Sequence, residues 1–166
     1  KAGADQELSF TDRLGLSIAR FGFETLLLHG ASALSDMTRG QDSPVFRLAA
    51  QLCIVNTGLV SLLVQERLNG ALAHALYYAL RDMPGFLEVL HGDAVAWGSV
   101  VLLALEGNKA EAARLKTFLG EVGSLSSLAE IGLAPDDIEA WLPQALAQPD
   151  MEQPPAPLTP EMVLRA

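Results

Sequence analysis

Residues 70–98 read GALAHALYYALRDMPGFLEVLHGDAVAWG, and this stretch decides the fold class. Small and apolar residues fill its first half without alternating with polar ones, which favours a helix over a strand. We expect that helix to run from about Glu66 to Met83, because Pro84-Gly85 supplies the turn that ends it. A further helix then begins at His91 or Asp93 and reaches about residue 105.

The chain before this stretch has the same helical character. Residues 10–28 place apolar side chains at helical spacing, with Ser9 or Thr11 as the N-cap and Gly30 just past the end. Ser43-Pro44 is a good N-cap and first-turn pair for a helix that continues to about residue 64. Because that helix is apolar nearly all round, we expect it to be buried.

Three further helices are expected after residue 105. Asn108 and Glu111 have the spacing of a capping box, which begins a helix toward Val122. Gly123 and Gly132 frame a short helix. Residues 134–137, Ala-Pro-Asp-Asp, then open a helix that carries three apolar residues on one face: Trp141, Leu142 and Ala145.

These patterns predict an all-α fold, a multi-helix bundle. We expect residues 1–166 to form a single helical domain, with a helical core at 10–148, a proline-rich linker at 149–158 and a terminal helix stub at 159–166. The chain contains no G-x-G-x-x-G segment after a strand and no βαβ pattern to hold one. No dinucleotide-binding domain is therefore expected.

Composition limits the classes of partner. Half of the 166 residues are apolar and 19% are charged, which suits a chain with a sizeable core. Eleven basic against twenty acidic side chains give a net charge of -9, which repels nucleic acid and anionic membrane surfaces. The lone cysteine, Cys53, is expected to be a buried apolar residue in a reducing compartment.

Residues 48–65 are uncharged and approach the length of a membrane-spanning helix. Polar side chains recur through the segment and raise the cost of insertion, which favours a core helix. The amino terminus has no apolar segment typical of a secretory signal. We expect a cytoplasmic protein that interacts with neither membrane nor nucleic acid.

The three histidines are the candidates for chemistry. His29 is expected to cap the last carbonyls of the first helix, beside Gly30. His74 lies in the middle of one predicted helix and His91 at the start of the next, so the two could hold a metal ion. The alternative is that both are hydrogen-bonded core residues, and a metal would need a third ligand.

Three segments carry a family resemblance. Residues 70–76, with His91 following His74 by seventeen positions, resemble the paired histidine motifs of the iron-containing alcohol dehydrogenase superfamily, most of all its glycerol dehydrogenase-like branch. The family motif H-G-E-x-V-A-x-G is matched at 91–98, with Asp93 in place of glutamate. Residues 122–133 resemble the family's V-G-x-P-x-x-L-x-x-L-G-L stretch without its proline.

The resemblance implies a C-terminal helical domain like that of dehydroquinate synthase-like and iron-containing alcohol dehydrogenases. In such enzymes a zinc or iron ion, held by two histidines and an acidic residue, polarises the alcohol oxygen while hydride passes to NAD. His74 and His91 match the two histidine ligands. The family's acidic ligand aligns upstream of Lys1, and within this chain the candidate is Asp12, which lies closer to His74 in sequence than the family pattern places it.

We therefore predict a helical metal-site domain resembling that of an NAD-dependent polyol dehydrogenase of the glycerol type. Alone it should be inactive, since the nucleotide domain and the acidic ligand are missing. Metal should bind weakly and NAD should not bind this chain. One alternative is a non-catalytic interaction or oligomerisation module derived from the family. Another is one subunit of a split dehydrogenase, so the expected partner is another copy or a separate nucleotide-binding chain.

Overall fold

A computed structural model describes residues 8–65, 72–81, 86 and 89–147. Every regular element in these residues is a helix, which confirms the all-α prediction. The chain divides into two compact units, one of Asp5–Asn69 and one of Gly70–Ala166 with Lys1–Ala4. The predicted linker at 149–158 and the stub at 159–166 lie outside the described residues, and the assignment of the whole chain to a single domain stays a prediction.

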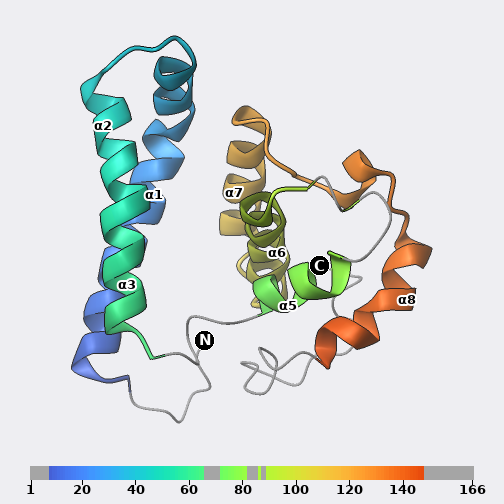
Figure 1. The fold of residues 1–166 in the computed structure, drawn as a ribbon. Coiled ribbons are helices and arrows are strands. Elements are labelled where there is room, and N and C mark those ends of the chain that lie inside the picture. Colours follow the sequence, from blue (N-terminus) through green and yellow to red (C-terminus); the bar gives the residue numbers. More distant parts are fainter. Residues whose placement is uncertain (1–7, 66–71, 82–85, 87–88, 148–166) are drawn as a thin grey trace. The chain divides into compact units, whose positions relative to one another are not determined.

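The first unit is a helical hairpin. Its first arm is α1 (Phe10–Thr38), and its second arm is α2 (Pro44–Gln51), a π-helical turn η1 (Leu52–Asn56) and α3 (Thr57–Leu63), which follow one another directly. All three segments of the second arm contact α1, and Figure 1 shows the two arms side by side. The predicted helix from Ser43-Pro44 is confirmed, with Ser43 as its N-cap.

The first helix begins as predicted but ends ten residues later. Ser9 is the N-cap and forms a capping box with Asp12. The prediction that Gly30 lies past the end is wrong, because the helix continues to Thr38 and the left-handed glycine that follows its end is Gly40, at φ 67°. Glycine lowers helix stability by only about 1 kcal/mol, so a lone glycine between strong helix formers does not stop a helix.

Two glycines of α1 lie against the second arm of the hairpin. A Cβ on Gly15 would lie 2.3 Å from Cγ2 of Val64, and one on Gly22 would lie 3.2 Å from Nδ2 of Asn56. That amide also donates to the Ile18 carbonyl oxygen at 3.3 Å. The arms therefore meet through small residues and a side-chain hydrogen bond.

The prediction that the helix after Pro44 is buried is wrong. Leu52 is its only buried residue up to Leu63, and Cys53, expected in the core, is exposed. Pro44–Leu63 is long and apolar enough to cross a membrane by length and composition alone, and a single helix of this kind is weak evidence for a membrane span. An apolar composition all round predicts that a helix needs cover, but it does not identify the element that supplies it.

The second unit is a cluster of helices: α5 (Leu72–Leu80), α6 (His91–Leu105), α7 (Lys109–Glu121), the 3₁₀ turn η2 (Leu128–Ile131) and α8 (Pro135–Leu146). Helix α6 packs on α5 and α7, and α5 also packs on α8. These helices confirm the predicted elements. One part stays outside the described residues: the start of the helix predicted at 66–83, up to residue 71, and its end with the following turn at 82–85.

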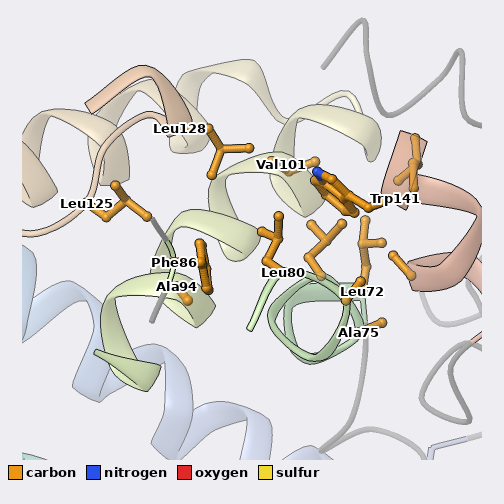
Figure 2. Packing of buried hydrophobic residues seen from close by; sticks show 13 residues of the cluster. Leu72, Ala75, Leu80, Phe86, Ala94, Val101, Leu125, Leu128 and Trp141 are labelled. Atoms are coloured by element: carbon orange, nitrogen blue, oxygen red, sulfur yellow. The ribbon is translucent and has the colours of Figure 1, made fainter. Parts of the chain in front are cut away.

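The hydrophobic core of this unit lies among α5, α6 and α8. Figure 2 shows Leu72, Leu80, Val101 and Trp141 gathered in one interior. Leu142 and Ala145 are fully buried beside Trp141, which confirms the predicted apolar face of α8. The predicted capping box at Asn108 is wrong, because Asn108 occupies the N-cap position without a side-chain hydrogen bond.

Candidate metal centre

The two candidate histidines lie on neighbouring helices of the same compact unit. His74 is the third residue of α5 and is half-buried, whereas His91 is the first residue of α6 and is exposed. Helices α5 and α6 share the most extensive packing between elements in the described residues. The packing of α5 on α6 therefore brings together His74 and His91, the two side chains predicted to act as a pair.

The imidazole rings lie close enough to share one ion. Their centroids are 5.6 Å apart and their planes are tilted by 49°. Two imidazole nitrogens bound to one tetrahedral metal at about 2.0–2.1 Å would place the ring centroids roughly 5 Å apart. The observed separation is slightly longer, and a small rotation of the His74 side chain would bring both rings within reach of one zinc or iron ion.

Tyr77 lies against His91 and was not predicted as part of the site. Its ring meets that of His91 edge-on, with centroids 4.4 Å apart. The signal was present in the sequence, because Tyr77 follows His74 by three residues and so lies on the same face of α5. Tyr78 contacts Tyr77 at 5.4 Å, and Arg81 lies over the Tyr78 ring at 5.7 Å.

The imidazole nitrogens are not used in hydrogen bonds within the described part of the chain. There the His74 ring contacts that of His91, and the His91 ring also contacts that of Tyr77. The alternative of two hydrogen-bonded core histidines therefore gains no support from these residues. Histidine nitrogens without a protein partner remain available as ligands.

Asp93 fixes the turn that carries His91. Its Oδ1 accepts a hydrogen bond from the Ser124 hydroxyl at 2.5 Å, which links the first turn of α6 to the loop after α7. This aspartate occupies the glutamate position of the family motif, and Ser124 belongs to the third segment that resembles the family. The structure thus joins two segments that the sequence placed thirty-one residues apart.

Asp12, the acidic candidate, lies in the hairpin unit. Its side chain is fully buried, and its Oδ1 accepts from the Gln65 backbone N–H at 3.0 Å. Its Oδ2 accepts from the Ser9 backbone N–H, the Ser9 hydroxyl and the Gln65 side-chain amide at 2.6–3.0 Å. The Ser9 hydroxyl and the Gln65 backbone N–H lower the pKa of Asp12 to about 2, against a smaller opposing effect of burial. These donors account for a buried carboxylate, and the role of Asp12 as a ligand stays a prediction.

A complete set of three ligands is not formed by the described residues. Among them, no three His, Cys, Asp or Glu side chains are close enough to hold one ion. The predicted cap role of His29 is wrong, because this histidine lies within α1, nine residues before the end of that helix. The structure therefore supports a pair of histidines rather than a closed site.

No family model matches the chain, but individual proteins do. It is 33% identical over 102 residues to hydroxycarboxylate dehydrogenase A of Escherichia coli, a match that covers 61% of this chain and 28% of that protein. It is 30% identical over 144 residues to glycolaldehyde reductase of Halobacterium salinarum, which covers 84% of this chain and 38% of that protein. The chain thus spans about a third of the relatives that it matches.

Solved structures of two related folds superpose on most of this chain. A probable glycerol dehydrogenase from Sinorhizobium meliloti superposes with a TM-score of 0.79 at 23% identity, covering 92% of this chain and 43% of that one. Glycerol dehydrogenase from Schizosaccharomyces pombe gives 0.77 at 22% identity, covering 92% and 39%. Together with the sequence relatives, these structures confirm the resemblance predicted from the two histidine segments.

Proposed function

We propose that this chain, a C-terminal helical domain of the iron-containing alcohol dehydrogenase superfamily in its glycerol dehydrogenase-like branch, supplies the metal-holding half of a polyol dehydrogenase active site. The observation that carries the proposal is the pairing of His74 and His91, 5.6 Å apart on two packed helices. Two imidazoles without hydrogen-bond partners among the described residues are a suitable donor set for zinc or ferrous iron.

Each part of the site has a separate task in this proposal. His74 and His91 hold the ion, and Tyr77 limits the rotation of the His91 ring through its edge contact. When bound, a divalent ion would polarise the oxygen of an alcohol substrate. The acidic ligand is either Asp12 or a residue outside the described part of the chain.

The hydride acceptor must be held elsewhere. These 166 residues contain no glycine-rich phosphate cradle for NAD, and hydride transfer needs the nicotinamide held next to the carbinol carbon. We therefore propose that the chain is inactive by itself. A nucleotide-binding domain, in a longer polypeptide or in a separate chain, would complete the cleft.

Calorimetric titration of the full chain with Zn²⁺ at neutral pH tests the site. We expect weak binding that His74→Ala and His91→Ala each reduce by at least about tenfold, since each removes one of two ligands. His29→Ala is the matched control and should bind as the wild type does, because His29 lies within α1 in the other unit. Submicromolar binding that survives His74→Ala would show that the ion is held elsewhere.

Asp12 is tested in the same titration. If this carboxylate is the third ligand, Asp12→Asn should weaken zinc binding as strongly as the loss of either histidine. If its role is confined to the hydrogen bonds with Ser9 and Gln65, zinc affinity should stay unchanged while the hairpin loses stability. Circular dichroism on the same samples separates the two results.

A second candidate function is favoured by the surface of the hairpin. Among the described residues, eleven of the twelve exposed large apolar side chains lie in the hairpin, and Leu62 and Ile54 are 85% and 74% exposed. An apolar surface of this kind is typical of an interaction site. The chain would then be a non-catalytic module that associates with itself through α1 and α3.

Sedimentation velocity separates this candidate from the first. A self-associating module should sediment as a dimer or larger species, and Leu62→Glu should convert it to a monomer without loss of helicity. Ser61→Glu, at the neighbouring exposed position, should leave the assembly intact. A wild-type chain that is monomeric at high concentration would contradict this function.

A further inference from the structure

The packing of α5 on α6 depends on one glycine. Gly98 lies seven residues after His91, which places both on the same face of α6. A Cβ added at Gly98 would lie 2.8 Å from the Cα of Ala73 and 3.0 Å from its carbonyl oxygen. Both atoms belong to the α5 backbone, so no change of side-chain rotamer can relieve the contact.

The residue that Gly98 touches is the neighbour of the first candidate ligand. Ala73 is buried and immediately precedes His74 on α5. The distance between two packed helices is set by the side chains at their contact, and the absence of a side chain allows the closest approach. The position of His74 relative to His91 is therefore coupled to the size of residue 98.

We infer that Gly98 is a positioning residue, which keeps α5 and α6 close enough for His74 and His91 to reach one ion. This inference rests on the proposed function for its metal readout. An alanine at 98 would have to move from 2.8 Å to the ordinary contact distance of 3.4 Å, which separates the backbones by about 0.6 Å. Metal–ligand distances tolerate only about 0.2 Å, so a rigid pair of ligands cannot follow this movement.

Rotation of the His91 side chain compensates for such a shift only by breaking another contact. The His91 ring is held edge-on by Tyr77, which also belongs to α5, so turning His91 toward the displaced His74 breaks that contact. The separation of the helices should therefore be visible in the Tyr77–His91 contact even when no metal is present. This provides a readout that does not depend on the proposed metal site.

The experiment compares Gly98→Ala with Gly92→Ala in the full chain. Gly92 is the matched control, because it lies on the same helix and a Cβ there meets nothing within 4 Å. Two quantities are measured: the nuclear Overhauser effect between the Tyr77 and His91 rings without metal, and the affinity for Zn²⁺ alone. Gly98→Ala should lose the ring-to-ring signal and weaken zinc binding about tenfold or more, while Gly92→Ala keeps both.

A control variant tests whether a general loss of stability, rather than the spacing of α5 and α6, explains the effect of Gly98→Ala. Leu119→Ala removes a buried side chain of α7 that is not part of the core cluster formed by α5, α6 and α8. It should keep the ring-to-ring signal and the zinc affinity. If it weakens zinc binding as much as Gly98→Ala does, the effect of Gly98 is one of stability and the inference is wrong.

The remaining outcomes are also decisive. If Gly98→Ala does not fold, Ala73→Ser, which adds one oxygen atom on the α5 side of the same contact, replaces it and should give a smaller loss of both signals. Retention of the ring contact and of zinc affinity within twofold in the folded variant would overturn the inference. A third outcome is that the wild type binds no zinc while Gly98→Ala still loses the ring contact. This result would refute the proposed function and leave the positioning role of Gly98 intact.

Discussion

The two units of this chain are both helical, but they bury their apolar side chains very differently. Of the twenty buried apolar residues in the described part of the chain, three belong to the hairpin: Ala33, Leu52 and Val64. The other seventeen belong to the helical cluster. The exposed large apolar side chains among the described residues show the reverse distribution, with eleven in the hairpin and only Leu90 in the cluster.

The difference shows that two means of holding helices together operate in one chain. In the cluster, a continuous core of leucine, alanine and aromatic side chains joins α5, α6 and α8. In the hairpin, the arms meet through Gly15, Gly22 and a buried carboxylate that links Ser9 to Gln65. The cluster therefore depends on burial, and the hairpin depends on close backbone approach and hydrogen bonds.

The largest expected effect is on the free energy of unfolding, when a buried leucine of the cluster and an exposed leucine of the hairpin are each replaced by alanine. Leu76→Ala should lower the free energy of unfolding of the cluster by about 2–5 kcal/mol, because Leu76 is fully buried in the core. Leu62→Ala in the hairpin is the matched control and should change stability by less than about 0.5 kcal/mol, since that side chain is 85% exposed. Urea denaturation followed by circular dichroism measures both.

A large loss of stability in Leu62→Ala would sharpen the comparison in a specific way. It would mean that the hairpin surface is covered in solution by another apolar surface. The loss should then grow smaller as the protein is diluted, because assembly depends on concentration. A loss that is independent of concentration would contradict the exposed position of Leu62.

The second prediction concerns the glycines of the hairpin. Gly15→Ala should destabilise it by about 1–3 kcal/mol, because the new Cβ would lie 2.3 Å from Cγ2 of Val64 and 3.3 Å from Cβ of Leu63. Gly58→Ala, within α3, meets nothing within 4 Å and should stabilise the helix by about 0.5–1 kcal/mol. Thermal unfolding of the two variants should shift in opposite directions, and equal shifts would show that the arms do not meet at Gly15.

Much of the helical architecture could be predicted from sequence. Ser43-Pro44, Ala134-Pro135 and the glycine at 132 mark ends by local chemistry, and the structure confirms each of them. Gly30 failed as an end signal because a glycine ends a helix only when its backbone turns left-handed, and that choice depends on the residues around it. Burial of the helix after Pro44 failed because composition does not reveal which surfaces meet.

The candidate site was predictable in part for a similar reason. His74 and His91 stand out by residue type and by the motifs around them, and the structure places them together. Gly98 and Ser124 have no such distinguishing chemistry, and their roles appear only when α6 is packed against α5 and joined to the loop after α7. Contacts across the chain are not encoded in any local pattern.

The third prediction uses the carboxylate that joins the hairpin arms. Because the folded pKa of Asp12 is about 2, below the usual value of 3.8, its ionised form stabilises the hairpin above about pH 4. That stabilisation should be lost as the pH falls from about 4 toward 2. Hydrogen exchange of α1 and α3 amides should show the loss in the wild type and a flatter dependence in Asp12→Asn.

A second variant identifies the cause of that pH dependence. Ser9→Ala removes the hydroxyl that lowers the pKa of Asp12 most, so the loss of protection below about pH 4 should be smaller than in the wild type and should be complete at a higher pH. Amides of α7, in the other unit, provide the internal reference. If α7 and α1 lose protection together in every variant, the pH dependence does not arise at Asp12.

The smallest expected effect compares one helix cap from each unit. In the hairpin, the Ser43 hydroxyl accepts from the Phe46 backbone N–H at 3.0 Å, so Ser43→Ala should cost about 1 kcal/mol. In the cluster, Asn108 has the N-cap position without a side-chain hydrogen bond, so Asn108→Ala should stay within about 0.5 kcal/mol of the wild type. Urea denaturation with helical ellipticity as the signal measures both variants. An equal cost at the two positions would mean that the capping box predicted at Asn108 forms in solution, and that the cluster, like the hairpin, uses polar caps to define its helices.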